Sequence, residues 1–441
     1  MKKIITIILM IVLLSACAPA QQIEVLPLAS PTQAPMIYYV GTKGSDANLG
    51  REDAPFKTIQ RAINIVPSGA TIIVTEGDYP ERPVILASKS NLTIQAHGKV
   101  TTRGFHIARN SGTVIDGFEI TAKSSVYVEG FGIWIQGTNC IIRNNYIHDT
   151  AWGGILTLYY TSGCTLKDNK IVGNVSQNGI DLRGTNHIVE GNEIADVRQM
   201  SKYLSSPPSY ADADGIHFHG SGHIIRNNYI HDIPYGGDNV DTHTDCMQTW
   251  NGGTEQPQAV NVIVENNRCE NIDAITNEIL TKGMQVQHAS GLIVRNNIFC
   301  AAVGLRMDAA TGLIIENNEL CGNPELAANI VSDCIQFANA IGTLNSNYCR
   351  NFSGSAVRLD GSNTIKTNAP NFALNTKLKA GTEYLFTITL TSTPSKVPTI
   401  TITKTATLPP TVTPTATKQI TPTPTAYCVQ ALDVWVCNRK P

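Results

Sequence analysis

The sequence contains few charged residues and has no excess of basic ones. Of its 441 residues only 15% are charged, and the formal net charge is −2. Proteins that bind nucleic acid usually present a basic surface, so this balance excludes DNA and RNA as partners. Aromatic residues are scarce as well, at 6%, whereas the hydrophobic fraction of 42% suffices for a packed core.

A hydrophobic run long enough to cross a membrane is also missing. The apolar run from Ile4 to Leu14 is too short to span a bilayer, and it follows Lys2 and Lys3, as in an export signal. It ends in Leu-Ser-Ala-Cys17, which resembles the lipobox of bacterial lipoproteins. That resemblance implies cleavage before Cys17 and a lipid on the new N-terminus. The alternative is an ordinary signal peptide.

These features predict a monomer of the cell envelope that is lipid-anchored and faces outside the cytoplasm. It would contact the membrane through its anchor only. Composition divides the chain into a signal peptide (1–16), a lipidated tether (17–37), a folded domain (38–390), a Thr/Pro-rich linker (391–426) and a short Cys-containing tail (427–441). Besides Cys17 there are ten cysteines, which suit disulfides or buried thiols in such a compartment.

The folded domain is built from repeats. An Asn recurs every 21 to 39 residues, and the shortest spacings match one coil of a parallel β-helix. Asn suits the turn because it tolerates left-handed backbone angles, and stacked amides can hydrogen-bond along the axis. The regular leucines of leucine-rich repeats are missing. The repeated residues are Asn145, Asn169, Asn192, Asn228, Asn267, Asn297 and Asn318.

The N-terminal end of the domain has a helical pattern instead. Ile59, Ala62, Ile63 and Val66 fall on one helix face, and Pro67 ends it. A buried strand, 71–74, and a turn, 76–79, are predicted to follow. A short helix at this place caps the open edge of a solenoid. The sequence therefore predicts an all-β, single-stranded parallel β-helix with an N-terminal capping helix.

A second column of residues marks where one strand of each coil begins. Long loops precede three successive strands, at 214, 245 and 282, and another insertion runs from Gly252 to Gln258. Insertions gathered on one side of a solenoid usually build its binding face. The column is Gly132, Gly154, Gly179, Gly215, Cys246, Gly283 and Gly304.

Polar residues concentrate on these strands. With Ile216 and Phe218 pointing inward, the residues between and after them point outward. The first outward column is Trp134, Leu156, Asp181, His217, Gln248, Gln285, Arg306, Gln336 and Arg358. The second is Gln136, Leu158, Arg183, His219, Trp250, Gln287 and Asp308. Since neighbouring coils are ~4.8 Å apart, these side chains can line one groove together with Asp214, Asp245 and Lys282.

Two reactions fit such a groove. In uronate elimination a base removes the proton beside a neutralised carboxylate, and Arg306 could clamp that carboxylate. The candidate bases are Lys282, His243 and His217. In glycoside hydrolysis, Asp214 and Asp245 would be the acid and its partner. The candidate substrate-binding residues are Asp181, Arg183, His219, Gln248, Trp250 and Gln285, and Trp134 and Trp250 could stack on sugar rings.

Calcium is the candidate cofactor, because several aspartates offer the hard oxygen ligands that it prefers. Asp212, Asp214, Asp238, Asp241 and Asp245 supply them, and we place the metal on Asp214, Asp241 and Asp245.

Structural explanations compete with these assignments. A polar stripe can be ordinary solvation, and an Asp before Gly can stabilise a turn, as Asp214 does before Gly215. His148 and His231 recur after the Asn turn, which favours a structural role. Cys140 with Cys164, and Cys300 with Cys321, fall at like positions on adjacent coils, so they suit packed stacks or disulfides better than metal ligands.

The N-terminal pattern, the repeated Asn and the loops before one strand resemble the right-handed parallel β-helix, pectate-lyase-like superfamily over residues 38–390. The Ala213-Asp214-Gly215 motif is similar to family nine polysaccharide lyases, which use calcium and a lysine base. Asp214 and Asp245 match their aspartates, whereas Thr244 and Gln248 replace two others. The lysine position falls on Gln285, with Lys282 three residues earlier.

Polygalacturonases show a similar order of aspartate strands, and Arg306 fits their arginine strand. Thr244 replaces one aspartate of their catalytic pair, and Lys282 stands where their His-Gly motif has histidine. The resemblance thus implies a protein acting on an acidic polysaccharide, by β-elimination first and by hydrolysis as the alternative. A non-catalytic glycan-binding or adhesive protein is the rival hypothesis.

Overall fold

The computed structural model describes residues 36–198, 203, 213–234, 244–272, 281–322 and 332–367, and five further strands up to residue 437. The predicted lipidation residue Cys17, the predicted ligands Asp212, Asp238 and Asp241, and the candidate base His243 lie outside the described residues. Among the described residues, no helix is long and apolar enough to cross a membrane.

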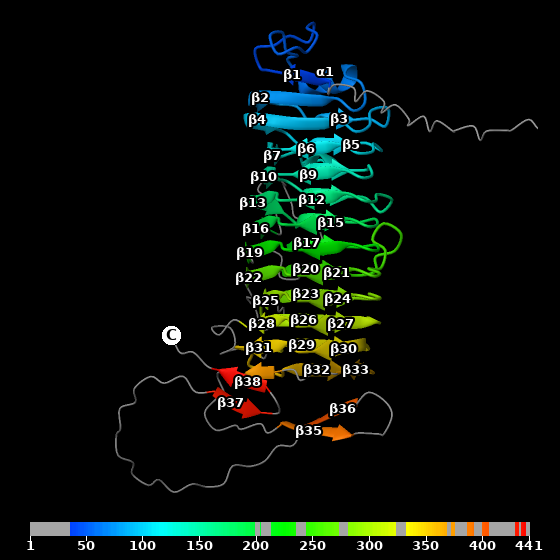
Figure 1. The fold of residues 1–441 in the computed structure, drawn as a ribbon, viewed down its shortest axis with the longest axis vertical. Helices are drawn as coiled ribbons and strands as arrows, with labels where there is room; N and C mark the ends of the chain where they lie inside the picture. The colour runs from blue at the N-terminus through cyan, green and yellow to red at the C-terminus, as the bar shows by residue number, and fades with distance from the viewer. Residues whose placement is uncertain are drawn as a thin grey trace, which may run out of the picture.

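The predicted capping helix is present as α1 (Ile59–Ile65) at the end of the solenoid where the chain enters (Figure 1). Asp46 accepts hydrogen bonds from the N–H groups of Lys57 and Thr58, and Glu81 accepts from those of Ile59 and Gln60. These carboxylates satisfy the donors that a helix leaves open at its N-terminus. The turn predicted at 76–79 is wrong, because strand β2 (Thr71–Tyr79) continues through a bulge at Gly77.

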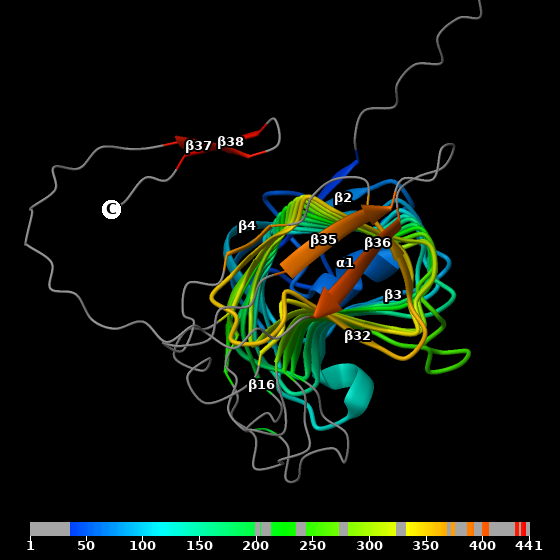
Figure 2. The same cartoon turned by 90° about the horizontal axis from the view of Figure 1, so that it is seen from below.

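The strands stack into two long parallel sheets, which wrap around one core (Figures 1 and 2). We call the eleven-stranded one sheet 2. Its strands are β3 (Val84–Ile85), β5 (Phe105–Ile107), β8 (Phe131–Ile135), β11 (Gly153–Thr157), β14 (Asn178–Leu182), β17 (Asp214–Phe218), β20 (Asp245–Thr249), β23 (Lys282–Gln287), β26 (Val303–Asp308), β29 (Ile335–Ala338) and β32 (Val357–Asp360).

Sheet 1 contains the other strands of each coil, in two rows that β1 (Ile37–Val40), β2 and β4 (Thr93–Thr102) begin. The first row is β6 (Val114–Asp116), β9 (Ile141–Arg143), β12 (Thr165–Lys167), β15 (Ile188–Glu190), β18 (Ile224–Arg226), β21 (Ile263–Glu265), β24 (Ile293–Arg295), β27 (Leu313–Glu316), β30 (Ile341–Asn345) and β33 (Thr364–Lys366). The second is β7 (Glu119–Ala122), β10 (Tyr146–Thr150), β13 (Lys170–Ser176), β16 (Glu193–Arg198), β19 (Tyr229–Ile233), β22 (Arg268–Ile272), β25 (Ile298–Cys300), β28 (Glu319–Cys321), β31 (Tyr348–Arg350) and β34 (Phe372–Leu374).

Two antiparallel hairpins occur in the C-terminal part of the chain. Strand β35 (Phe386–Thr391) pairs with β36 (Thr399–Lys404), and β37 (Cys428–Ala431) pairs with β38 (Val434–Cys437). The last pairing places Cys428 opposite Cys437.

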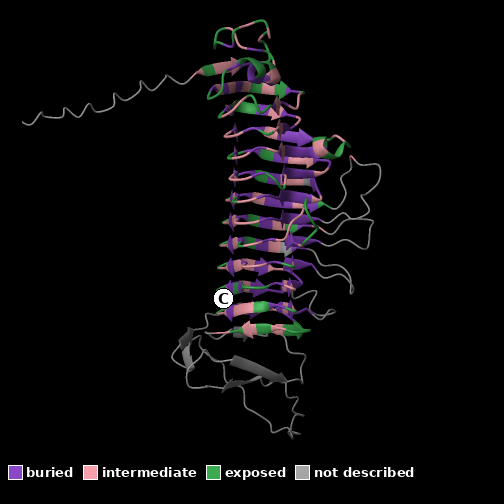
Figure 3. Ribbon diagram, turned by 90° about the vertical axis from the view of Figure 1, so that its right-hand side faces the viewer, coloured by how far each residue is buried: buried purple, intermediate pink, exposed green. Residues whose placement is uncertain are grey.

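The core is a set of aliphatic stacks that repeat from coil to coil, seen as recurring buried bands in Figure 3. In sheet 2 the parallel register aligns Ile180 with Ile216, and Ile216 with Met247. All three side chains are fully buried. The inward column predicted from the repeat is therefore confirmed.

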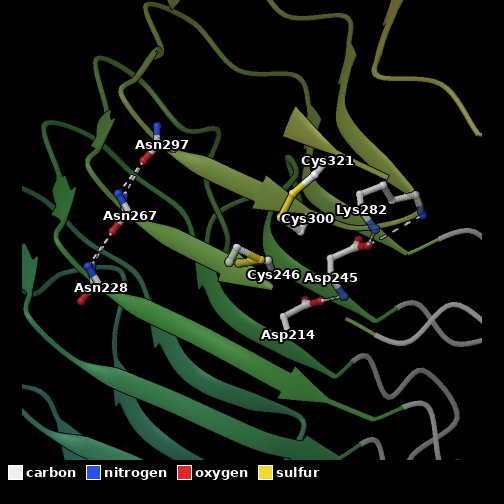
Figure 4. Close-up of a disulfide and its surroundings, with 10 residues drawn as sticks. Asp214, Asn228, Asp245, Cys246, Asn267, Lys282, Asn297, Cys300 and Cys321 are labelled. Atoms are coloured by element: carbon white, nitrogen blue, oxygen red, sulfur yellow. Dashed lines mark hydrogen bonds and ion pairs between the residues drawn. A yellow bond between two sulfur atoms is a disulfide. The ribbon is translucent and has the colours of Figure 1, made fainter. Parts of the chain in front are cut away.

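The repeated Asn residues form a continuous ladder inside the turns, as predicted. Each side-chain oxygen accepts from the backbone N–H and the amide of the preceding Asn; for example, Asn228 N–H and Nδ2 donate to Asn267 Oδ1 at 3.0 and 2.9 Å (Figure 4). The ladder extends to Asn347, which the sequence reading missed. The reason given for the turn needs correction: the preceding residue, such as Asn227, has the positive φ.

Two disulfides each replace a contact that a Gly makes with an aliphatic side chain in the preceding coil, Gly215 with Ile230 in one case and Gly304 with Leu320 in the other. An added Cβ on Gly215 would lie 2.4 Å from Ile230, so this corner has no room for a side chain. One coil later, Cys246 takes the Gly position, Cys269 takes the Ile position, and the two are bonded. Cys334 and Cys349 repeat the exchange. The predicted pair Cys300–Cys321 is also a disulfide, whereas Cys140 and Cys164 are buried free thiols.

Candidate functional site

The outward face of sheet 2 carries the predicted polar column. Strand register aligns Asp181 with His217, His217 with Gln248, Gln248 with Gln285, and Gln285 with Arg306. The sequence thus placed these side chains correctly relative to one another. Their exposure differs from the expectation of an open groove, because all of them except Arg306 are buried.

Asp214, Asp245 and Lys282 begin three neighbouring strands and form a row along the solenoid axis (Figure 4). Asp214 Oδ1 accepts from the backbone N–H of Asp245 at 3.2 Å, and Asp245 Oδ1 accepts from that of Lys282 at 2.8 Å. Lys282 Nζ lies 3.9 Å from the same Asp245 oxygen. Both carboxylates are fully buried and Lys282 is 5% exposed. The three residues converge, and each carboxylate also holds the start of the next strand.

The predicted calcium site is incomplete among the described residues. These contain no group of three or more His, Cys, Asp or Glu side chains that could hold a metal ion. Calcium takes six to eight oxygen ligands, and Asp214 and Asp245 already use one oxygen each for a backbone N–H. The described residues alone therefore do not fit calcium.

His217 and His219 form a directed pair of neutral imidazoles. His219 Nδ1 lies 3.0 Å from the carbonyl oxygen of Trp250, so it must donate, and its Nε2 then accepts from His217 Nε2 at 3.0 Å. Burial lowers the pKa of His219 to about 4 against the opposing charge of Asp181, and burial also lowers the pKa of His217 well below its usual value. The pair is therefore uncharged at neutral pH, and the tilted ring of Trp250 covers His217 at 4.0 Å.

Two buried amide oxygens beside this pair have no hydrogen-bond partner among the residues that the structure describes. Asn178 Oδ1 and Gln248 Oε1 are unsatisfied, although Asn178 is 9% and Gln248 4% exposed. Both residues neighbour His217: Asn178 Nδ2 lies 3.5 Å from its Nδ1, and Gln248 is its register partner. A buried acceptor without a donor costs free energy, so this place is suited to a ligand that brings donors. We call Asn178, Asp214, His217, Asp245, Gln248, Lys282 and Gln285 the polar cluster.

Arg183 and Asp181 are bound to each other. Arg183 Nε and Nη2 donate to the two Asp181 carboxylate oxygens at 2.9 and 2.6 Å. Burial acts to lower the pKa of Arg183, but the Asp181 carboxylate raises it more, so the guanidinium remains charged. Arg306 is partly exposed, and its Nε donates to Asp308 Oδ2 at 2.8 Å.

A cavity of about 650 Å³ lies on this face beside the polar cluster. Its floor is Trp134 on β8, Leu156 on β11 and Leu158 directly after β11. Arg183 lies at one side. Two segments complete the walls: the 3-10 helix η1 (Tyr127–Gly130), which stands outside the coil in Figure 2, and the loop 252–256.

The η1 wall is held from below by Arg82. This guanidinium donates to the carbonyl oxygens of Phe131, Val128 and Glu129 at 2.7, 3.0 and 3.2 Å. Trp152 supports the same turn, since its Nε1 donates to the Ser125 carbonyl and its ring contacts Tyr127 edge-on at 5.0 Å. Such contacts fix the wall before any ligand arrives.

The outward columns predicted from the sequence contain Trp134, Leu156, Leu158 and Arg183, and the predicted insertion from Gly252 to Gln258 forms one wall. Neither Tyr127 nor Tyr159 was predicted from the sequence. The available signal was the cluster of large side chains on the outward positions of β8 and β11, where a solvated strand would carry polar residues. His148 and His231 have the structural role expected of them, because each stacks on a tyrosine, Tyr146 or Tyr229.

Comparison with known proteins identifies the fold. A family model described as a right handed beta helix region matches residues 86–245 and 158–340, and a protein family of unknown function matches 42–84. No curated protein matches the sequence. A lacto-N-biosidase from Eubacterium ramulus superposes with a TM-score of 0.53 at 12% identity, over 77% of this chain and 68% of its own. XylC in complex with xylose has a TM-score of 0.50 at 13% identity, over 79% and 88%. At these identities the likeness shows the fold alone.

Proposed function

This chain belongs to the right-handed β-helix family, and from that premise we propose that it binds a polysaccharide along the outer face of sheet 2 and cleaves it. The observation that carries the proposal is the cavity over Trp134, Leu156 and Leu158. Aromatic and aliphatic surfaces pack against the apolar faces of sugar rings, while a few fixed polar groups orient the ligand. The two similar structures, one a biosidase and one bound to xylose, support a carbohydrate ligand.

Cleavage is assigned to the polar cluster, and β-elimination on a uronate residue is our first choice. Lys282 brings an amine into a buried site, near two amide oxygens to which no described residue donates. It would take the proton from the carbon beside the uronate carboxylate. A double bond then forms as the glycosidic oxygen leaves the neighbouring carbon. Arg306, partly exposed two strands beyond Gln248, is the candidate for binding the carboxylate.

Hydrolysis is the second candidate, favoured by the neighbouring carboxylates Asp214 and Asp245. It ranks lower because both are fully buried and each already accepts a backbone N–H. Calcium remains a proposal that depends on Asp241, and addition of a chelator tests it. The proposed lipid anchor is tested by labelling with a radioactive fatty acid, which Cys17→Ala should abolish.

The reaction is tested by incubating the protein with uronate polymers. Ultraviolet absorbance from unsaturated ends would establish elimination, whereas new reducing ends without that absorbance would establish hydrolysis. Binding with neither product identifies the rival, a non-catalytic glycan-binding protein. Absence of both binding and product across glycans of all classes overturns the proposal.

A further inference from the structure

We infer that the cavity binds an uncharged sugar residue, so that the polymer is a heteropolysaccharide with neutral and acidic residues. This inference rests on the proposed function and adds a specificity to it. The cavity lies beside one end of the polar cluster: β11 is one strand step from Asn178 on β14, and four steps, about 19 Å at ~4.8 Å per step, from Lys282 on β23. One extended glycan can therefore reach both places.

The charges around the cavity carry the inference. Arg183 is the only cation among the lining residues that the structure describes, and both Asp181 oxygens hold it. The side chains of this pair are only 10% and 3% exposed, so solvent does little to separate them. Glu255, another lining residue, is acidic. A uronate carboxylate would lose its hydration here without gaining an unpaired cation, and that loss is costly.

The shape and the remaining polar groups fit a neutral sugar ring. Trp134, Leu156 and Leu158 offer an apolar floor, and Tyr127 and Tyr159 stand at the walls. A guanidinium has five N–H donors, so the bonds from Arg183 to Asp181 and to Tyr127 still leave donors for hydroxyl oxygens of a sugar. Thr254 and Gln256 can exchange hydrogen bonds with hydroxyls from the other side. These are ligand contacts that need no charge on the sugar.

The walls are already in place, which favours selection by fit. Arg82 binds three carbonyl oxygens of the η1 wall, and Gly130 faces Trp152 so closely that an added Cβ would lie 2.2 Å away. A rigid wall keeps the width of the cavity constant, and little conformational entropy of the wall is lost when a ligand binds.

The test is calorimetric titration of the full-length protein with two sets of tetrasaccharides. The neutral set comprises xylo-, gluco-, manno- and galacto-oligosaccharides; the acidic set comprises oligogalacturonate and oligomannuronate. We expect at least one neutral tetrasaccharide to bind, and Tyr159→Ala to weaken it at least tenfold. Tyr146→Ala is the matched control, because Tyr146 and Tyr159 are 39% and 40% exposed but Tyr146 lies on sheet 1. Glu255→Lys should improve binding of the acidic set at the cavity.

The inference is overturned if no neutral tetrasaccharide binds, or if Tyr159→Ala leaves neutral binding intact. It is also overturned if Tyr159→Ala weakens the acidic set as strongly as the neutral one. These failures are distinct from failure of the proposed function, which is read from cleavage of uronate polymers and its dependence on Lys282. Neutral binding without any cleavage would keep the cavity assignment and remove the enzymatic proposal.

Discussion

Lys282 meets Asp245 twice: its backbone N–H donates to Asp245 Oδ1 at 2.8 Å, and its Nζ lies 3.9 Å from the same oxygen. The first contact holds the start of β23 and does not depend on the lysine side chain. The second places an amine within the polar cluster. Substitution of Lys282 can therefore test chemistry with little disturbance of the fold.

Lys282→Ala is expected to lower the rate of uronate cleavage by about 10²–10⁴-fold, the range typical of losing a general base. Lys282→Arg should be equally inactive, because a guanidinium cannot be deprotonated in a protein. Initial rates from ultraviolet absorbance measure both, and melting temperatures close to the wild type serve as the folding control. An active Lys282→Arg variant would exclude lysine as the base.

Acid should destabilise the protein below pH 6.5. Burial lowers the pKa of His219 to about 4 and that of His223 to about 3, and it lowers the pKa of His217 as well. Between pH 6.5 and these values the unfolded chain binds protons that the folded chain does not, so stability falls as pH falls. The expected slope is about 1.4 kcal/mol per pH unit for each such histidine.

Urea unfolding at pH 8, 6.5 and 5 measures this slope. His223 Nδ1 accepts from the backbone N–H of His187 at 3.2 Å, and Asn at this position keeps an acceptor but cannot titrate. His223→Asn should therefore reduce the slope by the contribution of one proton. A stability that is independent of pH between 8 and 5 contradicts the neutral assignment of these rings.

The Asn ladder should contribute more to the free energy of unfolding than the positive-φ turn residues beside it. Asn228 Oδ1 accepts from Asn192 N–H and Nδ2, and its own amide donates to the Val189 carbonyl. Asn228→Ala leaves buried backbone groups unsatisfied, at about 1–3 kcal/mol each. Asn227→Ala only places Ala at a φ of 56°, which costs about 1–2 kcal/mol. Denaturant unfolding of the two variants gives the ranking, and the reverse order would contradict the ladder's role.

Thiol labelling should separate two classes of cysteine. In denaturant without reductant, an alkylating reagent should modify Cys140 and Cys164, and leave Cys246, Cys269, Cys300, Cys321, Cys334 and Cys349 unmodified. In the folded protein Cys140 and Cys164 should react slowly, because both are fully buried. Peptide mass spectrometry reads both results. Protection of Cys140 and Cys164 after denaturation would show that they are paired.

The coil register could be predicted from the sequence because each coil needs the same hydrogen bonds and the same core contacts. Asn228 and Asn267 must hydrogen-bond to each other across a coil, and Ile216 must meet Met247 in the core. A shift by one residue would turn every inward side chain outward. The pairing of Cys246 with Cys269 was not predicted, although Cys246 stands in the Gly column of the sequence.

The cavity could not be predicted in this way. Its walls come from Tyr127 on η1 and from the loop 252–256, segments that no repeat relates to each other. Arg82 lies far from both in sequence, yet it holds the η1 wall through three carbonyl oxygens. No repeat pattern in the sequence shows that such irregular segments lie next to each other, so only the folded structure reveals their contact.

The sequence by itself therefore determined the β-helix, its register and the face on which Asp181, His217, Gln248 and Lys282 align. Because every coil repeats the same hydrogen bonds and the same core contacts, only one register between coils satisfies them all. Only the tertiary structure decided that Asp214 and Asp245 are buried and hold strand starts, that Arg183 is neutralised by Asp181, and that a cavity opens over Trp134. Burial and charge pairing depend on distances between side chains from different coils, and these distances exist only in the folded chain.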